Sequence, residues 1–385
     1  MDAPVVAIGE KPLLGLRVGH FGHLDFGYAR NRIVAKALRR AGASVLEIGD
    51  RRRFPARTPR LTRAGWAADP DVILVGFPGH SDVATAKLVS LRRRVPVVFD
   101  ALVSLWETNV LDREVVPRRG LAQYRYRVTD RVACSLADAI LLDTDAHIAW
   151  FRAAFGIPAR KLHRLWVGAD DELMTPCDAS AGDGGFTVFF YGSFIPLHGV
   201  EHIIGAAKRV QAEDPEVRFV LCGSGQTLPA MRRLIASEGV ANVEFLDPRP
   251  VPELRRLICS ADVCLGIFGT GPKARSVIPN KVFDALACRR PVITGASPAA
   301  REALTHGKDV WLCPAGDANA LADAITTLKA DPGARARIAT AGHELFVRRF
   351  SIDALAADVS RTLLDVLERP REPRTAPVGG GPGTL

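Results

Sequence analysis

The sequence predicts an α/β protein in which two successive βα domains, each built on a parallel sheet, face each other across a cleft. Short apolar runs of strand length alternate with amphipathic stretches of helical length along most of the 385 residues, and this alternation is typical of parallel sheets covered by helices. A polar, glycine-rich and acidic segment interrupts the alternation near residues 168–185, and the same alternation then begins again.

In the first half, apolar runs predict the strands and amphipathic stretches between them predict the helices. The strands are expected at 16–20, 44–48, 71–77, 96–100, 139–143 and near 162–167. The helices are expected at 28–42, 81–93, 119–137 and 145–155. Because ligands of open parallel sheets bind beyond the carboxyl ends of the strands, the cleft between the domains is the expected site.

The second half repeats the alternation. The strands are expected at 186–192, 218–223, 243–247, 262–268, 291–294 and 310–313. The helices are expected at 199–212, 227–238, 252–260, 280–288, 298–305, 317–330, 332–347 and 352–367. This pattern predicts a first domain at 1–170, a linker at 171–185, a second domain at 186–350, a last helix at 351–368 and a disordered Pro/Gly-rich tail at 369–385.

Composition is that of a globular protein, with 48% hydrophobic and 24% charged residues. The longest apolar runs are too short to span a membrane and no leader segment is evident, so we expect a cytoplasmic protein. The seven cysteines occur singly and are expected to be reduced core residues rather than disulfides or metal ligands: Cys134, Cys177, Cys222, Cys259, Cys264, Cys288 and Cys313.

The net charge of +9 is concentrated in the first half of the chain. The cations there include Lys36, Arg39, Arg40, Arg51–Arg53, Arg92–Arg94, Arg118, Arg119, Arg125, Arg127 and Arg131. Such a surface favours anionic partners, although a merely solvated surface explains it equally simply. Only Tyr124 and Tyr126 alternate with these cations, too few for stacking on single-stranded nucleic acid, so no nucleic-acid partner is expected.

The segment from Gly266 to Ala287, GIFGTGPKARSVIPNKVFDALA, places the cations Lys273, Arg275 and Lys281 in a loop that runs into a helix beginning near Asn280. Unpaired N–H groups and a partial positive charge at a helix N-terminus, together with added cations, suit a diphosphate. Asp284, one turn inside that helix, could hold ribose hydroxyls. The alternative is an exposed basic loop before an amphipathic helix.

Two turns of the second domain carry small residues directly after strands, where backbone amides can approach a phosphate. The first turn reads FYGSFIPLHGVEHIIGAA and contains Gly192, Ser193 and His198. The second reads CGSGQ and contains Gly223 and Gly225. Taken alone, each is also compatible with an ordinary turn.

Together, YGSFIPLHGVEHIIGAA, FVLCGSGQ, VEFLDPRP, ADVCLGIFGTGPKARSVIPNKVFDALACRRPVIT and SPAAREAL resemble glycosyltransferase family 4. These are retaining enzymes with two Rossmann-like domains, the GT-B fold. The resemblance covers nearly all of residues 185–350; in the first half it is looser and rests on LRVGHFGHLDFGYARNRIVAKALRRAG. It implies a nucleotide-sugar donor on the second domain, an acceptor on the first, and a last helix that crosses back to the first domain.

By position, the resemblance implies that Asp284 grips the ribose and that Lys281, with Asn280, lies beside the diphosphate. Ser193 and His198 occupy positions where many members of the family carry an arginine and a lysine. Ser276 stands where the family's first acid would touch the donor sugar. Lys273 and Arg275 could replace the missing phosphate cations, and the FIPLHG and PNK segments identify a subtype.

In the first domain, the turn HFGHLDFGYARNR follows the first strand and is expected to border the acceptor. The residues concerned are Gly22, His23, Asp25, Tyr28 and Arg30. Asp100 ends the strand PVVFD, where many members have an acid near the reacting sugar; a helix-capping carboxylate is the equal alternative. We therefore predict Asp100, His198 and Lys281 as catalytic residues.

No pair of acids is placed to seat Mg²⁺ on a diphosphate, because Asp170 and Asp171 fall in the linker, so metal-independent transfer without a cofactor is expected. The expected partners are a nucleotide-sugar and a carbohydrate, lipid-linked or small-molecule acceptor. The basic first domain suggests peripheral contact with an anionic membrane at its inner face. A sugar-nucleotide epimerase or phosphorylase, and a non-catalytic partner of another transferase, stay open as alternatives; the serines at 193 and 276 motivate the latter.

Overall fold

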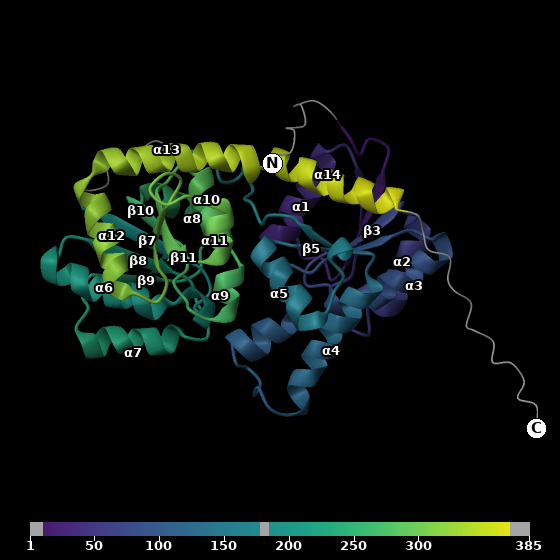
Figure 1. Cartoon of the computed structure of the whole chain (residues 1–385), viewed down its shortest axis with the longest axis horizontal. Coiled ribbons are helices and arrows are strands. Elements are labelled where there is room, and N and C mark those ends of the chain that lie inside the picture. Colours follow the sequence, from purple (N-terminus) through teal and green to yellow (C-terminus); the bar gives the residue numbers. More distant parts are fainter. Residues whose placement is uncertain (1–10, 178–184, 370–385) are drawn as a thin grey trace, which may run out of the picture.

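A computed structural model describes residues 11–177 and 185–369, and Figure 1 shows two α/β domains side by side. Parts of the predicted linker (178–184) and of the predicted tail (370–385) lie outside the described residues. Each domain contains a six-stranded sheet in which all neighbouring strands pair in parallel. The predicted fold class is confirmed.

The sheet of the first domain has the order β2-β1-β3-β4-β5-β6. Its strands are β1 (Arg17–Gly22), β2 (Ser44–Gly49), β3 (Val72–Val75), β4 (Val97–Asp100), β5 (Ala139–Leu142) and β6 (Leu162–Arg164). The helices are α1 (Ala29–Arg40), α2 (Thr58–Ala68), α3 (Val83–Arg93), α4 (Leu121–Leu136) and α5 (Asp145–Phe155). The central strands are fully buried because helices cover both faces of the sheet, which explains their continuous apolar sequences.

The sheet of the second domain has the order β12-β11-β10-β7-β8-β9. Its strands are β7 (Thr187–Tyr191), β8 (Arg218–Cys222), β9 (Val243–Leu246), β10 (Val263–Leu265), β11 (Val292–Ala296) and β12 (Trp311–Pro314). The helices are α6 (Val200–Glu213), α7 (Leu228–Glu238), α8 (Val251–Ser260), α9 (Pro272–Ser276), α10 (Asn280–Ala287), α11 (Pro298–Ala303), α12 (Ala318–Ala330) and α13 (Pro332–Arg349). In both sheets the strand order reverses direction beside the first strand, and such switch points open crevices at the carboxyl ends.

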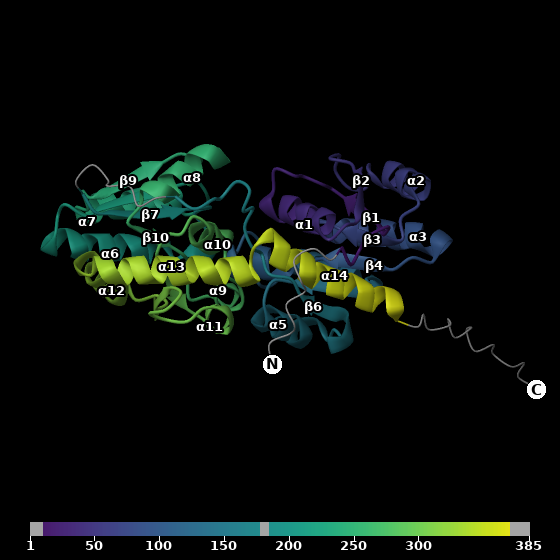
Figure 2. The same ribbon diagram turned by 90° about the horizontal axis from the view of Figure 1, so that it is seen from above.

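The last helix, α14 (Ile352–Glu368), returns to the first domain and packs against α1. In Figure 2, α13 and α14 run one after the other along both domains. The hydroxyl of Ser351 caps the start of α14 by accepting a hydrogen bond from the backbone N–H of Ala354 at 3.2 Å, and Phe350 just before it is fully buried. The ring of Phe350 contacts Trp166 of the first domain and Phe283 of α10, with centroid distances of 5.5 and 4.9 Å.

Several short elements were not predicted from the sequence, and three of them bear on the site or its domain. The helix α2 follows a run of arginines and prolines that lacks an apolar period, and α9 is a single short helix within the expected loop. A π-helical turn, η2 (Glu107–Asp112), follows β4 and contacts α9 across the domain boundary. Each depends on contacts with the neighbouring structure rather than on a strong helical pattern, because tertiary packing stabilises most short helices.

The expectation that all seven cysteines are reduced is wrong for two of them. Cys177, within the predicted linker, forms a disulfide with Cys259 in α8, and their Cα atoms are 5.9 Å apart. The two are separated by 82 positions in sequence, so spacing gave no signal for the pair. The remaining cysteines among the described residues are free and buried, as predicted: Cys134, Cys222, Cys264, Cys288 and Cys313.

We predict that Cys259→Ser lowers the unfolding free energy of the oxidised protein by about 2–4 kcal/mol, because the disulfide restricts the unfolded chain. Thermal unfolding of wild type and variant should differ without reductant and coincide with it. Equal midpoints under non-reducing conditions would contradict a disulfide between these residues.

Candidate active site at the domain boundary

The first turn of the second domain brings the backbone of Gly192 close to two functional side chains. Gly192 adopts a φ of 147°, which favours glycine. A Cβ atom at this position would lie 3.2 Å from Lys281 Nζ and 3.0 Å from His198 Cε1. The open backbone at the end of β7 therefore faces the Lys281 ammonium directly.

His198 and Lys281 form a buried pair. His198 Nδ1 contacts the carbonyl oxygen of Ser193, which can only accept a hydrogen bond, so this nitrogen carries the proton. His198 Nε2 then accepts from Lys281 Nζ at 3.1 Å. Burial and the Lys281 charge hold the pKa of His198 well below its usual value, and burial lowers the pKa of Lys281 to about 7. A neutral His198 thus orients the Lys281 ammonium.

Asp284 lies one turn further along α10, as the sequence indicated, and accepts a hydrogen bond from the hydroxyl of Tyr191. Burial raises the pKa of Asp284 to about 7, against the effect of the Tyr191 hydrogen bond. Burial also raises the pKa of Tyr191 well above its usual value, so its hydroxyl stays protonated and donates. A carboxylate held in this way is costly to ionise without a further polar partner, and ribose hydroxyls would supply one.

Lys273 faces the first domain. Its ammonium donates to Thr108 Oγ1 at 2.6 Å, and its side chain is buried. Burial lowers the pKa of Lys273 despite the nearby carboxylates of Glu107 and Asp112. The charges of Lys281, Lys273 and Arg113 all lower the pKa of His198. Cations from both domains therefore act electrostatically on His198.

The other predicted residues of the α9–α10 segment differ from one another in how deeply they are buried. Arg275 is exposed, whereas Ser276 is buried and its hydroxyl donates to the carbonyl of Pro272 within α9 at 3.2 Å. The backbone carbonyl of Ser276 accepts from Thr144 of the first domain. Asn280 begins α10 and is partly exposed. The structure thus brings Lys273, but not Arg275, into the buried cluster.

Gly223 and Gly225 allow the two turns of the second domain to pack together. Both have positive φ values, and Cβ atoms there would lie 1.9 Å from Gly192 O and 2.6 Å from Phe194 N. Phe194 N also donates to the carbonyl of Ser224. Ser193, between these contacts, has an exposed side chain. The glycines hold the first turn in place behind the site.

The sequence analysis missed several polar residues that follow β4 and β5. Glu107 is fully buried and its Oε2 lies 3.3 Å from His147 Nε2, while His147 Nδ1 lies 2.7 Å from Asp143 Oδ1. Burial alone would lower the pKa of His147, but these carboxylates raise it to about 9, so it is charged at neutral pH. Burial also raises the pKa of Asp112. Their position just after the carboxyl ends of two strands is the sequence feature that could have identified them as candidate site residues.

Asp100 and Arg30 form an internal ion pair rather than an exposed part of the cleft. Each side chain is 1% exposed, and the guanidinium binds both carboxylate oxygens, at 2.8 and 2.9 Å. Arg30 also donates to the carbonyls of Leu165 and Trp166. Asp100 makes no helix cap in this arrangement. The pair fixes α1 to the end of β4 and to the segment that leads to the second domain.

The other predicted acceptor residues line the turn after β1. A Cβ on Gly22, whose φ is 121°, would lie 2.9 Å from Asp82 Oδ2, and the same oxygen accepts from the backbone of His23 at 2.9 Å. Asp25 accepts from the backbone of Gly27, and the Tyr28 ring packs on Phe77. These contacts give the turn a defined shape.

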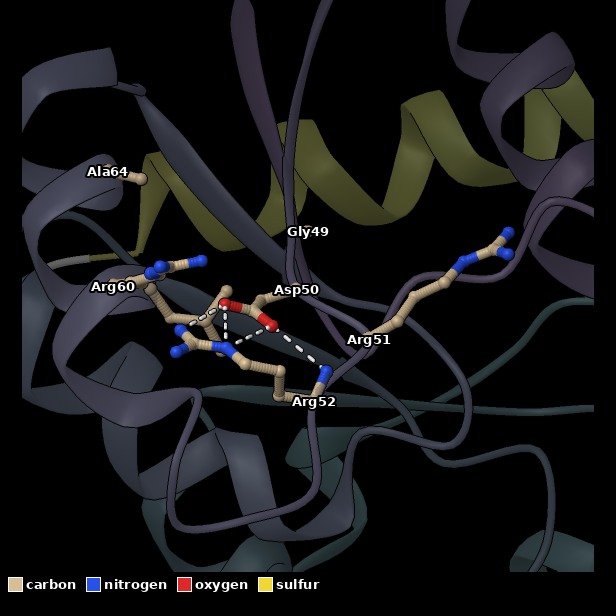
Figure 3. A pocket seen from close by; sticks show the side chains of 7 residues that line it. Gly49, Asp50, Arg51, Arg52, Arg60 and Ala64 are labelled. Carbon is tan, nitrogen blue, oxygen red and sulfur yellow. Dashed lines mark hydrogen bonds and ion pairs between the residues drawn. The ribbon is translucent and has the colours of Figure 1, made fainter.

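A cavity of about 660 Å³ lies beside this turn, at the carboxyl end of β2. It is lined by Gly49, Asp50, Arg51, Arg52, Arg60, Leu61 and Ala64. Figure 3 shows Arg52 wrapped around Asp50, with Arg60 next to them and Arg51 directed away. Arg51 reaches Asp25 of the turn at 3.0 Å. The hydrogen bonds from Arg52 lower the pKa of Asp50 to about 2.

Within residues 11–177 and 185–369, no group of three or more His, Cys, Asp or Glu side chains is arranged to hold a metal ion. Over the same residues, no helix is both long and apolar enough to cross a membrane.

The second domain matches the family model described as glycosyl transferases group 1, over residues 185–331. The chain is 27% identical over 226 residues to D-inositol 3-phosphate glycosyltransferase of Kribbella flavida, covering 54% of this chain and 52% of that protein. It is 29% identical over 204 residues to GDP-mannose-dependent alpha-(1-6)-phosphatidylinositol monomannoside mannosyltransferase of Mycolicibacterium smegmatis, covering 50% and 53%. The chain thus spans about half the length of these relatives.

The whole fold is similar to that of Anabaena HepE in complex with UDP-glucose. The TM-score is 0.71 at 17% identity, covering 91% of this chain and 99% of that one. Sucrose-phosphate synthase from Thermosynechococcus elongatus gives a TM-score of 0.69 at 17% identity, covering 91% and 99%. These likenesses show the two-domain GT-B architecture.

We predict that Asp100→Ala lowers the unfolding free energy by about 3–5 kcal/mol, because it leaves the Arg30 guanidinium buried without its partner. The double variant Arg30→Met/Asp100→Leu should recover most of this loss, since it removes both charges. Denaturant unfolding measures both effects. A near-neutral Asp100→Ala would contradict the structural importance of the pair.

We predict that Asp284→Asn changes the pH dependence of stability. The folded-state pKa of about 7 exceeds the ordinary value of 3.8, so the wild type loses stability as pH rises from about 4 to about 7. The variant lacks this loss, so its melting temperature relative to wild type should rise between pH 5 and pH 8. Glu244→Gln, on the exposed side of β9, is the control. A pH-independent offset for Asp284→Asn would exclude the raised pKa.

Proposed function

We propose that this protein is a retaining, metal-independent glycosyltransferase that transfers a sugar from a nucleoside-diphosphate sugar to an acceptor hydroxyl. The observation that carries the proposal is the buried contact between Lys281 and His198 beside the open backbone of Gly192, with Asp284 one helical turn further along α10. Similarity to group 1 glycosyltransferases supports the same reaction class.

The donor is proposed to lie across the first turn of the second domain. Asp284 receives hydrogen bonds from the ribose, and Lys281 binds the diphosphate beside the open backbone of Gly192. Lys273 of α9 and Arg113 of the first domain add positive charge near the diphosphate. His198 positions the Lys281 ammonium. The FIPLHG and PNK segments supply His198 and Lys281, and we propose that they define a subtype in which Lys273 replaces a missing phosphate cation.

In the proposed reaction, the bond between the anomeric carbon and the diphosphate oxygen breaks, and the leaving group takes the electron pair. The acceptor hydroxyl oxygen attacks the same face of the anomeric carbon, and its proton passes to the departing phosphate oxygen. The configuration is therefore retained. Preorganised cations stabilise the charge that develops on the diphosphate, as a metal ion does in other transferases.

The acceptor is proposed to bind between the turn that contains His23 and the arginine-lined cavity beside β2. Asp25 and Arg51 connect the two. In this arrangement Asp100 and Arg30 position the acceptor domain through their buried ion pair and do not contact substrate. A carbohydrate, a lipid-linked sugar or a small molecule all fit the proposal.

A non-catalytic partner of another transferase is the second candidate. The observation that favours it is Ser276, whose hydroxyl is used within α9 and whose carbonyl is used by Thr144. That position therefore offers the donor sugar no carboxylate, and its hydroxyl proton is already donated within α9. Binding of nucleotide with no turnover of any sugar would support this candidate.

We predict that one of UDP, GDP, dTDP and ADP binds in calorimetry and that Lys281→Ala weakens this binding about 10- to 100-fold, as expected for loss of a charge-assisted hydrogen bond. Lys208→Ala, which removes an exposed lysine of the same domain, is the matched control and should leave binding unchanged. Absence of binding by all four nucleotides would overturn the proposal.

The reaction itself is tested with the sugar derivatives of the nucleotide that binds. Turnover should persist in excess chelator, and the anomeric configuration of the product, read by NMR, should match that of the donor. Loss of turnover with chelator that Mg²⁺ restores would refute metal independence, and an inverted product would refute retention.

A further inference from the structure

The outer face of α4 exposes a stripe of apolar side chains. Leu121, Tyr124, Val128 and Val132 are 90, 54, 56 and 46% exposed. Successive members are three or four positions apart. Because an α-helix turns by about 100° per residue, this spacing puts all four on one side of the helix. Scattered exposed apolar residues are common, but a continuous stripe on one helix marks an interaction surface.

The opposite face of α4 anchors the helix firmly to the first domain. Ala133 and Cys134 are buried there, and Asp130 is buried as well. The Asp130 carboxylate accepts hydrogen bonds from the hydroxyl of Ser104 and from two backbone N–H groups of the following residues, at 2.6 to 3.0 Å. The helix therefore cannot rotate to bury its apolar stripe without breaking this network.

Cations flank the stripe and exposed acids are absent from the helix. At about 100° per residue, Arg125 lies on one side of the stripe and Arg131 on the other, and both are exposed. Arg127, also exposed, stacks over Trp106 at 5.1 Å. Asp130, the one acid within Leu121–Leu136, is buried on the opposite face. The surface that the helix offers is therefore apolar along its middle and positive at its edges.

The position of α4 relates this surface to the candidate active site. Residues 113–120 connect it directly to the π-helical turn η2, where Thr108 receives the Lys273 ammonium. In Figure 1, α4 lies on the side of the first domain opposite α14. Exposed Val115 and Arg119 lie in the connection, so the surface continues from the helix toward the cleft.

We infer that the outer face of α4 docks on an anionic membrane surface. The apolar stripe enters the headgroup region while the arginines bind lipid phosphates, which is the physics of interfacial amphipathic helices. The exposed arginines of α4 select this occupant, because the helix exposes no acid and a second copy of α4 would bring like charges together. The one exposed acid of the connection, Glu114, is paired with Arg118 at 2.9 Å. Docking depends only on the exposed side chains of α4 and not on the donor site. If the proposed sugar transfer also holds, docking would bring the cleft to lipid-linked acceptors.

The test is sedimentation of the full-length protein with vesicles of phosphatidylcholine, with and without phosphatidylglycerol. We expect binding to the anionic vesicles only, reduced by added salt. Arg125→Gln/Arg131→Gln should weaken binding about 10- to 30-fold, since each arginine near the surface contributes about 1 kcal/mol. Leu121→Gln/Val128→Gln should weaken it to a similar degree while leaving the salt dependence in place.

Matched controls lie on the second domain. Arg233→Gln/Arg256→Gln removes two exposed arginines from α7 and α8, and Val347→Gln removes a 52% exposed apolar residue from α13. Melting temperature and nucleotide binding, measured separately, should be the same in all variants, so failure of docking is distinguishable from failure of the donor site.

Absence of binding to anionic vesicles, or equal weakening by the control and α4 variants, would overturn the inference. Sedimentation velocity measures the oligomeric state and so distinguishes membrane docking from self-association. If the wild type is an oligomer that Leu121→Gln/Val128→Gln dissociates, the stripe belongs to a second copy of the chain and the membrane assignment fails.

Discussion

The contact of Phe350 with Trp166 and Phe283 sets the relation between the two domains. These rings come from the crossing between α13 and α14, from the end of the first domain, and from α10. Because protein interiors are closely packed, moving one domain would require all three rings to repack. Phe283 immediately precedes Asp284. The same contact therefore fixes the helix that carries the residue proposed to bind the ribose. The Arg30–Asp100 pair supports the joint from the other side, through the carbonyls of Leu165 and Trp166.

Burying the charged side chains of the site at this boundary costs folding free energy. Lys281 and Lys273 are buried with lowered pKa values, and Asp284 is held with a raised one. None of these shifts favours the folded protein on its own, because burial penalises the charged forms. Such costs are characteristic of functional sites, where a bound ligand supplies the missing charge. A diphosphate would favour the charged lysines, and ribose hydroxyls would favour the ionised Asp284.

The sequence predicted much of the framework because parallel sheets leave a strong local pattern. Buried strands such as β3 and β5 read as continuous apolar runs, and the helices between them carry amphipathic periods. Gly192, His198, Lys281 and Asp284 were found because they follow strands or begin a helix in the second domain. The pattern failed for α2, because the run of arginines and prolines just before it reads as a loop, and for η2, whose π-helical turn has no characteristic spacing.

Residues of the site that came from the opposite domain were beyond local pattern. The sequence by itself determined the two-domain architecture and the position of Lys281 and Asp284, because apolar periodicity and strand–helix junctions are local properties. The return of the last helix to the first domain was implied by the family resemblance alone. Only the tertiary structure decided that Lys273 turns toward Thr108, that Asp100 pairs internally with Arg30, and that Cys177 meets Cys259. Each of these joins residues distant in sequence, and packing alone determines which side chains become neighbours.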